Sequence, residues 1–166
     1  RWEEIDLAKK TWTVPAARMK GGKEHRVPLS KAAIQLLMVQ PTRKQGGLVF
    51  PGSKPGTQLS DMALNVVMRR MQVTGVPHGL RSSFRDWAGE ETLHPREAAE
   101  MALAHIVANA TEGSYWRSDL FEKRRVMMED WCNFLLGEKK SLRKQILNRG
   151  HDLSLIHISE PTRRYA

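Results

Sequence analysis

The hydrophobic positions change their spacing early in the chain. Before the change, three short segments at residues 2–6, 11–14 and 26–29 are rich in Trp, Ile, Thr and Val. Such a composition, broken by polar and glycine-containing turns, is typical of β-strands. Two consecutive glycines at 21–22 allow the positive φ angles of a tight hairpin. The pattern therefore predicts a small sheet, with a hairpin turn that projects Lys20.

From Ser30 onward apolar residues recur three or four positions apart, which predicts amphipathic helices. We expect helices from Ser30 to Pro41, from Ser60 to about Val73, over about 79–92, from Pro95 to about His105, and from about Trp116 to Leu135. In the same order, the apolar residues expected to face the core are Ile34 and Leu37 on the first helix; Ala63, Val66, Val67 and Met71 on the second; Leu80, Phe84, Trp87 and Ala88 on the third; Ala98, Met101 and Ala102 on the fourth; and Trp116, Leu120, Met127, Trp131 and Leu135 on the fifth. The prediction is an α+β fold, mostly helical, with a small antiparallel sheet near the N-terminus.

Residues 141–166 differ from the rest of the chain. The segment from Leu153 to Arg163 reads like a translated sequencing-adapter sequence, and its apolar residues continue none of the helical faces. We therefore expect residues 1–140 to form the functional domain and residues 141–166 to be a non-native or disordered tail.

Composition and charge exclude some classes of protein and favour others. The apolar runs are too short for a membrane span, and the single cysteine, Cys132, excludes an intrachain disulfide. Both features suit a cytoplasmic protein. The net charge is +9, and residues 1–140 retain 22 Lys and Arg against 16 Asp and Glu. This moderate basic excess favours an anionic partner such as nucleic acid.

Five residues supply the groups that a phosphodiester transfer needs: Lys20, His78, Arg81, His105 and Tyr115. A tyrosine hydroxyl can attack phosphorus when cations neutralise the developing charge on the phosphoryl oxygens. Ionising a tyrosine at pH 7 costs roughly 4 kcal/mol, and neighbouring cations and a base lower that cost. Arg81 and Arg85 share a helix face without an evident acidic partner, so a bound anion would relieve their mutual repulsion.

Each of these residues also has an ordinary structural explanation. Lys20 fits a solvated turn, His78 the start of a helix, His105 a hydrogen-bonded core position and Tyr115 an interface. A zinc site from His78, His94 and His105 is a further alternative, but Cys or acidic ligands at fitting spacing are missing. We therefore expect neither a metal nor a cofactor. The order of the five residues, rather than any single one, favours phosphodiester chemistry.

Four motifs carry a resemblance to a known family. They are Arg18–Ser30 (RMKGGKEHRVPLS), His78–Arg81 (HGLR), Ala102–His105 (ALAH) and Tyr115–Asp119 (YWRSD). Together they resemble the catalytic domain of tyrosine recombinases, in the branch of prophage and genomic-island integrases. The resemblance covers about residues 1–137. The His-x-x-Arg motif is common alone, but its combination with the other three in this order is specific.

The resemblance implies site-specific DNA recombination, which integrates or excises a mobile element. Tyr115 would attack a DNA phosphodiester and form a 3′-phosphotyrosyl bond, without metal or ATP. Arg81 would bind the scissile phosphate, His105 would hydrogen-bond a non-bridging oxygen, His78 would assist proton transfer from Tyr115, and Lys20 would protonate the leaving 5′-oxygen. The implied partners are double-stranded DNA attachment sites and a homotetramer of the full-length protein, associated with the bacterial nucleoid during the reaction.

One part of the family pattern has no match. The family has a further arginine on a helix before the first strand, and Arg1 lies too close to that strand to be this residue. We therefore expect an N-terminally truncated domain without its DNA-clamping region, nearly inactive alone. Two other functions stay open, a non-catalytic DNA-binding remnant and strand relaxation of the type IB topoisomerase kind. Assembly of a tetramer on two DNA sites would separate recombination from relaxation.

Overall fold

The computed structural model describes residues 1–54, 56–105 and 118–137. A three-stranded antiparallel sheet in the order β1-β2-β3 is formed by β1 (Ile5–Asp6), β2 (Thr11–Val14) and β3 (His25–Pro28). In the register, Trp12 pairs with Ile5 on one side and with Val27 on the other. The first strand is shorter than predicted, because a 3-10 turn, η1 (Trp2–Glu4), takes up the residues before it.

The connection between β2 and β3 contains a second 3-10 turn, η2 (Ala16–Arg18), followed by the two glycines. Gly22 adopts a φ of 63° and donates a backbone hydrogen bond to Met19, 2.9 Å away. A positive φ is readily accessible to glycine and unfavourable for most other residues. The predicted glycine turn is present, and Lys20 is exposed within it, but the connection over residues 15–24 is longer than the predicted tight hairpin.

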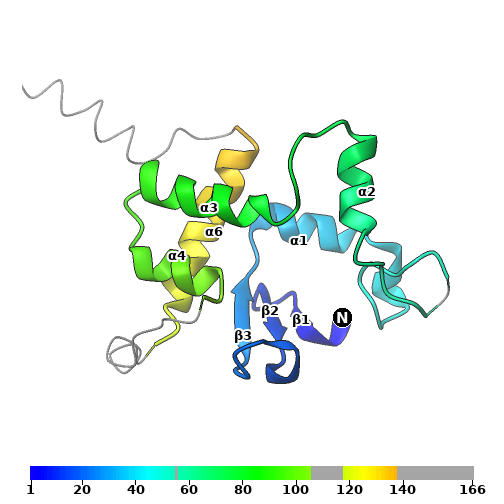
Figure 1. Ribbon diagram of the computed structural model, residues 1–166. Coiled ribbons are helices and arrows are strands. Elements are labelled where there is room, and N and C mark those ends of the chain that lie inside the picture. The colour runs from blue at the N-terminus through cyan, green and yellow to red at the C-terminus, as the bar shows by residue number, and fades with distance from the viewer. Residues whose placement is uncertain (55, 106–117, 138–166) are drawn as a thin grey trace, which may run out of the picture.

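Among the described residues, the further helical elements are α1 (Lys31–Met38), η3 (Pro41–Lys44), α2 (Ala63–Arg70), α3 (Gly79–Glu90), α4 (Arg96–Ala102) and α6 (Phe121–Leu135). Ser30 caps α1 as predicted, because its hydroxyl accepts a hydrogen bond from the amide of Ala33. Helices predominate over a small sheet near the N-terminus, which confirms the predicted α+β class (Figure 1). In the ranges that the structure describes, no helix combines the length and hydrophobicity that a bilayer span requires.

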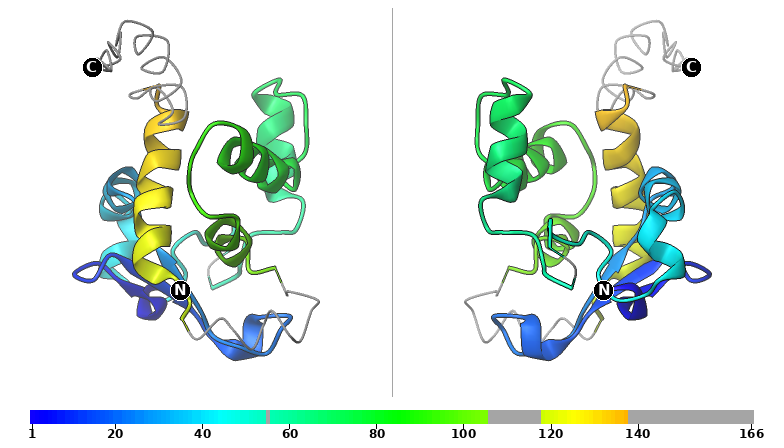
Figure 2. Two further views of the ribbon diagram at one scale, coloured as in Figure 1. Left: turned by 90° about the vertical axis from the view of Figure 1, so that its left-hand side faces the viewer. Right: turned by 90° about the vertical axis from the view of Figure 1, so that its right-hand side faces the viewer.

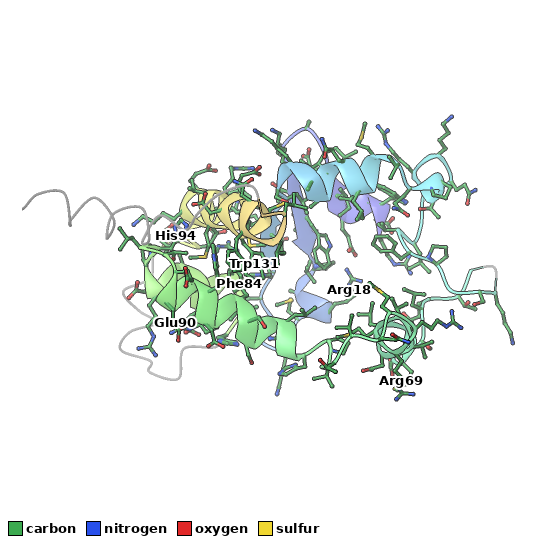
Figure 3. All side chains as sticks on the ribbon, turned by 90° about the horizontal axis from the view of Figure 1, so that it is seen from above. Arg18, Arg69, Phe84, Glu90, His94 and Trp131 are labelled. Carbon is green, nitrogen blue, oxygen red and sulfur yellow. The ribbon has the colours of Figure 1, made fainter. Side chains whose placement is uncertain are left out.

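The hydrophobic core lies where α3, α4 and α6 meet (Figures 1 and 2). Its buried members are Phe84, Trp87, Ala88, Ala98, Ala99, Leu103 and Met127. Trp131 of α6 packs against this cluster, with ring centroids 5.0 Å from Trp87 and 5.5 Å from Phe84. Figure 3 shows Phe84 and Trp131 side by side between α3 and α6. Alanines on α4 allow the helices to approach closely, and the aromatic rings fill the space beside them.

The predicted inner face of α2 is wrong. Val66, Val67 and Met71 are exposed, with 68% of Met71 accessible to solvent. None of the described residues of α2 is buried. The helix stands apart from the cluster of α3, α4 and α6 in Figure 1, so its apolar stripe has no described partner. It also begins at Ala63 instead of Ser60.

Two end positions of the core helices also differ from the prediction. Leu80 in the first turn of α3 and Leu135 in the last turn of α6 are exposed, because the opposing helices contact the middle of each stripe. On α4, Ala99 is fully buried, whereas Met101 is only partly so. Trp116, predicted to begin the last helix, lies outside the described residues.

Candidate active site

His78 and Arg81 lie together at the start of α3. His78 is the N-cap residue, and its carbonyl accepts a hydrogen bond from the amide of Arg81, 3.1 Å away. Both side chains are exposed. The N-terminal end of a helix carries a partial positive charge, which favours a bound anion. The first turn of α3 therefore combines an imidazole, a guanidinium and a favourable dipole.

The guanidinium of Arg81 also reaches the end of α4. Its Nη2 donates a hydrogen bond of 2.7 Å to the carbonyl oxygen of Leu103, the C-cap residue of that helix. His105 follows two residues later. A guanidinium has five N–H donors, so this bond fixes its position and leaves other donors free for a phosphate.

A Schellman motif ends α4 and places His105. Ala104 adopts a left-handed φ of 53° and donates to the carbonyl of Met101 at 3.1 Å, while the amide of His105 donates to the carbonyl of Glu100 at 3.0 Å. These two bonds reverse the chain and bring His105 back beside the last turn of its own helix. The turn normally favours glycine, so Ala104 carries some backbone strain.

Glu100 connects His105 to α3. One carboxylate oxygen lies 2.6 Å from Nδ1 of His105, and the other accepts a 2.6 Å hydrogen bond from Nε of Arg85. The hydrogen bond from His105 and the bond and charge of Arg85 hold the pKa of Glu100 below its ordinary value, against the opposing effect of burial. Arg85 thus has an acidic partner, and the expectation that it is unpaired is wrong.

Two predicted site residues remain, Lys20 and Tyr115. Lys20 is exposed on the loop between β2 and β3, and no bond joins it to another residue in the described part of the chain. Tyr115 lies outside the described residues. The structure therefore connects His78, Arg81 and His105 through neighbouring residues, and the convergence of all five groups stays a prediction.

Metal coordination was the alternative for three histidines. Within the described ranges, no three His, Cys, Asp or Glu side chains are grouped so that they could hold a metal ion. His94 pairs with Asp130 at 3.0 Å, near the aromatic cluster, whereas His105 pairs with Glu100 (Figure 3 shows His94). The two imidazoles thus have different carboxylate partners.

A buried arginine, which the sequence analysis missed, fastens α6 to the sheet. Arg124 is 1% exposed and donates hydrogen bonds to the carbonyl oxygens of Arg26, at 2.7 Å, and Asp119, at 2.8 Å. The Asp119 carboxylate lies between two guanidinium groups, 2.6 Å from Arg26 and 3.2 Å from Arg124. The ring of Phe121 lies below the guanidinium of Arg26, 4.5 Å from its centroid.

The network of Arg26, Asp119 and Arg124 holds the residues that immediately precede α6 against β3. Burial acts to raise the pKa of Asp119, but the hydrogen bond and charge of Arg26 and the charge of Arg124 outweigh it, so the pKa is lowered. The sequence does contain a signal for the network. Arg124 occupies the same helical stripe as Leu120, Met127 and Trp131, where a charged residue requires buried partners.

His25 links β3 to the end of α4. Burial and the charge of Arg124 lower its pKa, while a hydrogen bond with the backbone of Ala102 and the charge of Asp119 act in the opposite direction. The folded protein therefore favours the neutral imidazole at this position. An unperturbed histidine titrates near pH 6.5, so the unfolded chain binds the proton more readily than the folded chain.

His25 is thus expected to make folding acid-sensitive. Its contribution to stability is present above about pH 6.5 and decreases as the pH falls below this value, because protonation then favours the unfolded chain. We expect the free energy of unfolding in urea to fall between about pH 7.5 and pH 5.5, and to fall less in His25→Gln. An equal decrease in both proteins would contradict the assignment to His25.

Comparison with known proteins identifies the family. The model of the phage integrase family matches residues 1–120, a range that contains all five predicted site residues. The chain is 38% identical to prophage integrase IntA of Escherichia coli over 139 residues, which cover 81% of this chain and 33% of that protein. Prophage integrase IntZ of Escherichia coli is 35% identical over 80% of the chain and 34% of its own length.

The integrase of Shigella phage Sf6 is 30% identical over 81% of this chain and 36% of its own length. The chain therefore spans about one third of the length of these relatives. No solved structure matches it with comparable significance. The family match covers most of the chain and contains the His78–Arg81 turn, the ALAH turn and Tyr115. The chain belongs to the phage integrase family.

Proposed function

We propose that this chain is the catalytic part of a site-specific DNA recombinase that acts through a phosphotyrosine intermediate. The observation that carries the proposal is the bond from Arg81 to Leu103, which ties the His78–Arg81 turn to the turn that bears His105. A phosphate bound at the start of α3 would meet the guanidinium, two imidazoles and the helix dipole. Membership of the phage integrase family supports the same chemistry.

In the proposed reaction, the hydroxyl oxygen of Tyr115 forms a bond to phosphorus while the bond from phosphorus to the 5′-oxygen breaks. The tyrosine proton passes to His78, and Lys20 donates a proton to the leaving 5′-oxygen. Arg81 and His105 bind the non-bridging oxygens, where negative charge develops. The phosphotyrosyl bond conserves the energy of the cleaved bond, so a second 5′-hydroxyl can reverse the sequence and rejoin the strand.

Arg81 suits its role for two reasons. A guanidinium stays charged at every physiological pH and can contact two phosphate oxygens at once. Its position in the first turn of α3 adds the helix dipole, which contributes about 0.3–1 kcal/mol to anion binding at an exposed site. The bond to Leu103 orients the group before DNA binds, which reduces the entropy lost on binding.

The partners follow from the proposed reaction. We propose that the full-length protein binds double-stranded DNA attachment sites and assembles on them as a homotetramer, in the bacterial cytoplasm and at the nucleoid. Residues 1–140 would form the catalytic portion, and residues 141–166 would have no part in it. The basic excess of residues 1–140 suits a polyanionic partner.

A nicked suicide substrate tests the proposed function. The full-length protein should form an adduct with attachment-site DNA that survives detergent, because the cleaved strand diffuses away and cannot be rejoined. Trypsin would release residues 97–117 as one peptide, which contains Tyr115 and no other tyrosine. We expect mass spectrometry to find the nucleotide on this peptide. An adduct on any other peptide, or none at all, would refute the proposed nucleophile. On intact DNA, relaxation without strand exchange between two attachment sites would indicate activity of the topoisomerase kind.

A further inference from the structure

Among the residues that the structure describes, Glu100 is the acidic residue whose carboxylate contacts a predicted catalytic residue, His105. The Schellman turn at the end of α4 brings His105 back over Glu100, with one backbone bond of 3.0 Å and one side-chain bond of 2.6 Å between the same two residues. The carboxylate is itself held by Arg85 of α3. Its side chain is 20% exposed, whereas that of His105 is 45% exposed. Nδ1 of the imidazole is thus hydrogen-bonded to Glu100, while part of the His105 side chain stays accessible to solvent.

We propose that Glu100 is a positioning residue, which holds Nδ1 of His105 so that protonated Nε2 is presented to the phosphate. The inference rests on the proposed function, because it assumes that His105 contacts the phosphate. An ionised carboxylate only accepts hydrogen bonds, so Nδ1 must carry a hydrogen and donate it to Glu100. Nε2 is then the ring nitrogen that faces the substrate.

This geometry determines the charge that His105 needs. If Nδ1 carries a hydrogen in the neutral ring, Nε2 has only a lone pair and cannot donate to a phosphate oxygen. Donation requires the imidazolium, in which both nitrogens carry hydrogens. Glu100 therefore orients the ring so that Nε2 is the nitrogen that faces the phosphate.

Three guanidinium groups lie around Glu100 and the turn that bears His105. Arg85 from α3 contacts the Glu100 carboxylate, and Arg96 from α4 lies 3.9 Å from it. Arg81, also from α3, bonds to Leu103 two residues before His105. Glu100 offsets part of this positive charge, and its lowered pKa keeps it ionised at neutral pH.

A purely structural explanation is that Glu100 only fastens α4 to α3 through Arg85. That role predicts a loss of stability and a loss of activity that occurs whether or not His105 is present. The positioning role predicts a loss of activity that requires an intact His105. The two roles are therefore separable by experiment.

The test uses single-turnover cleavage of the suicide substrate by the full-length protein. Glu100→Gln should reduce the cleavage rate by about tenfold to a hundredfold, the range found when the hydrogen-bond partner of a metal-bound histidine is removed. Glu97→Gln is the matched control, because Glu97 is exposed on the same helix, and it should cleave at the native rate.

A double-mutant cycle completes the test. In a His105→Gln background, Glu100→Gln should cause no further loss of cleavage. Equal losses in the native and His105→Gln backgrounds would overturn the positioning role. If native protein forms no adduct at Tyr115, the proposed function fails instead. Should Glu100→Gln fail to fold, ¹⁵N NMR of the native ring decides, and a neutral form with its hydrogen on Nε2 would overturn the inference.

Discussion

Replacing Tyr115 with phenylalanine is expected to abolish the covalent adduct between the full-length protein and its attachment-site DNA. The substitution removes the hydroxyl oxygen that would bond to phosphorus and retains the ring. Without the phenolic oxygen at position 115, the proposed phosphotyrosyl bond cannot form there. The measurement is the yield of detergent-stable complex on end-labelled suicide DNA, which should fall below detection.

Two controls make this result specific. Tyr165→Phe removes the other tyrosine of the chain and should leave the adduct yield unchanged. The affinity of Tyr115→Phe for DNA should stay close to native, because phosphate binding depends on the cations rather than on the hydroxyl. If Tyr115→Phe still formed the adduct, Tyr115 would not be the nucleophile, and the roles proposed for the neighbouring groups would lose their basis.

Local sequence patterns predicted most of the elements, because propensity and tertiary environment agree there. The stripe of Phe84, Trp87 and Ala88 becomes the buried face of α3, and Ser30 caps α1. The inner face of α2 was predicted wrongly for a physical reason. A periodic apolar stripe shows only that a helix has a face to bury, and it does not identify the partner. Val67 and Met71 are exposed because the described residues provide none.

The site was predictable where a short motif specifies both chemistry and spacing. His78 and Arg81 are one helical turn apart, and both lie at the start of α3. The partner residues were not predictable in this way. The contact of Glu100 with His105 depends on the left-handed turn at Ala104. A positive φ is not predicted from sequence at an alanine, because alanine rarely adopts it. The contact of Arg85 with Glu100 depends on how α3 and α4 pack against each other.

Replacing Arg124 with alanine is expected to destabilise the folded chain severely. The substitution removes the donors to the carbonyls of Arg26 and Asp119 and leaves a cavity in a site that is 99% inaccessible to solvent. Removing one partner from a buried charged network typically costs about 3–5 kcal/mol. Whole-domain stability is typically about 5–15 kcal/mol, so the loss is a large share of it. Urea unfolding of the 166-residue chain, followed by circular dichroism, would measure the change.

Two further variants separate the causes of this loss. Arg125→Ala changes the adjacent residue, whose partly exposed guanidinium bonds to Glu122 and to the carbonyl of Lys9, and it should cost less than about 1 kcal/mol. Arg124→Met retains most of the volume but removes the donors, so a loss close to that of alanine would assign the effect to hydrogen bonding. If Arg124→Ala were no more destabilising than Arg125→Ala, the fastening of α6 to β3 could not depend on Arg124.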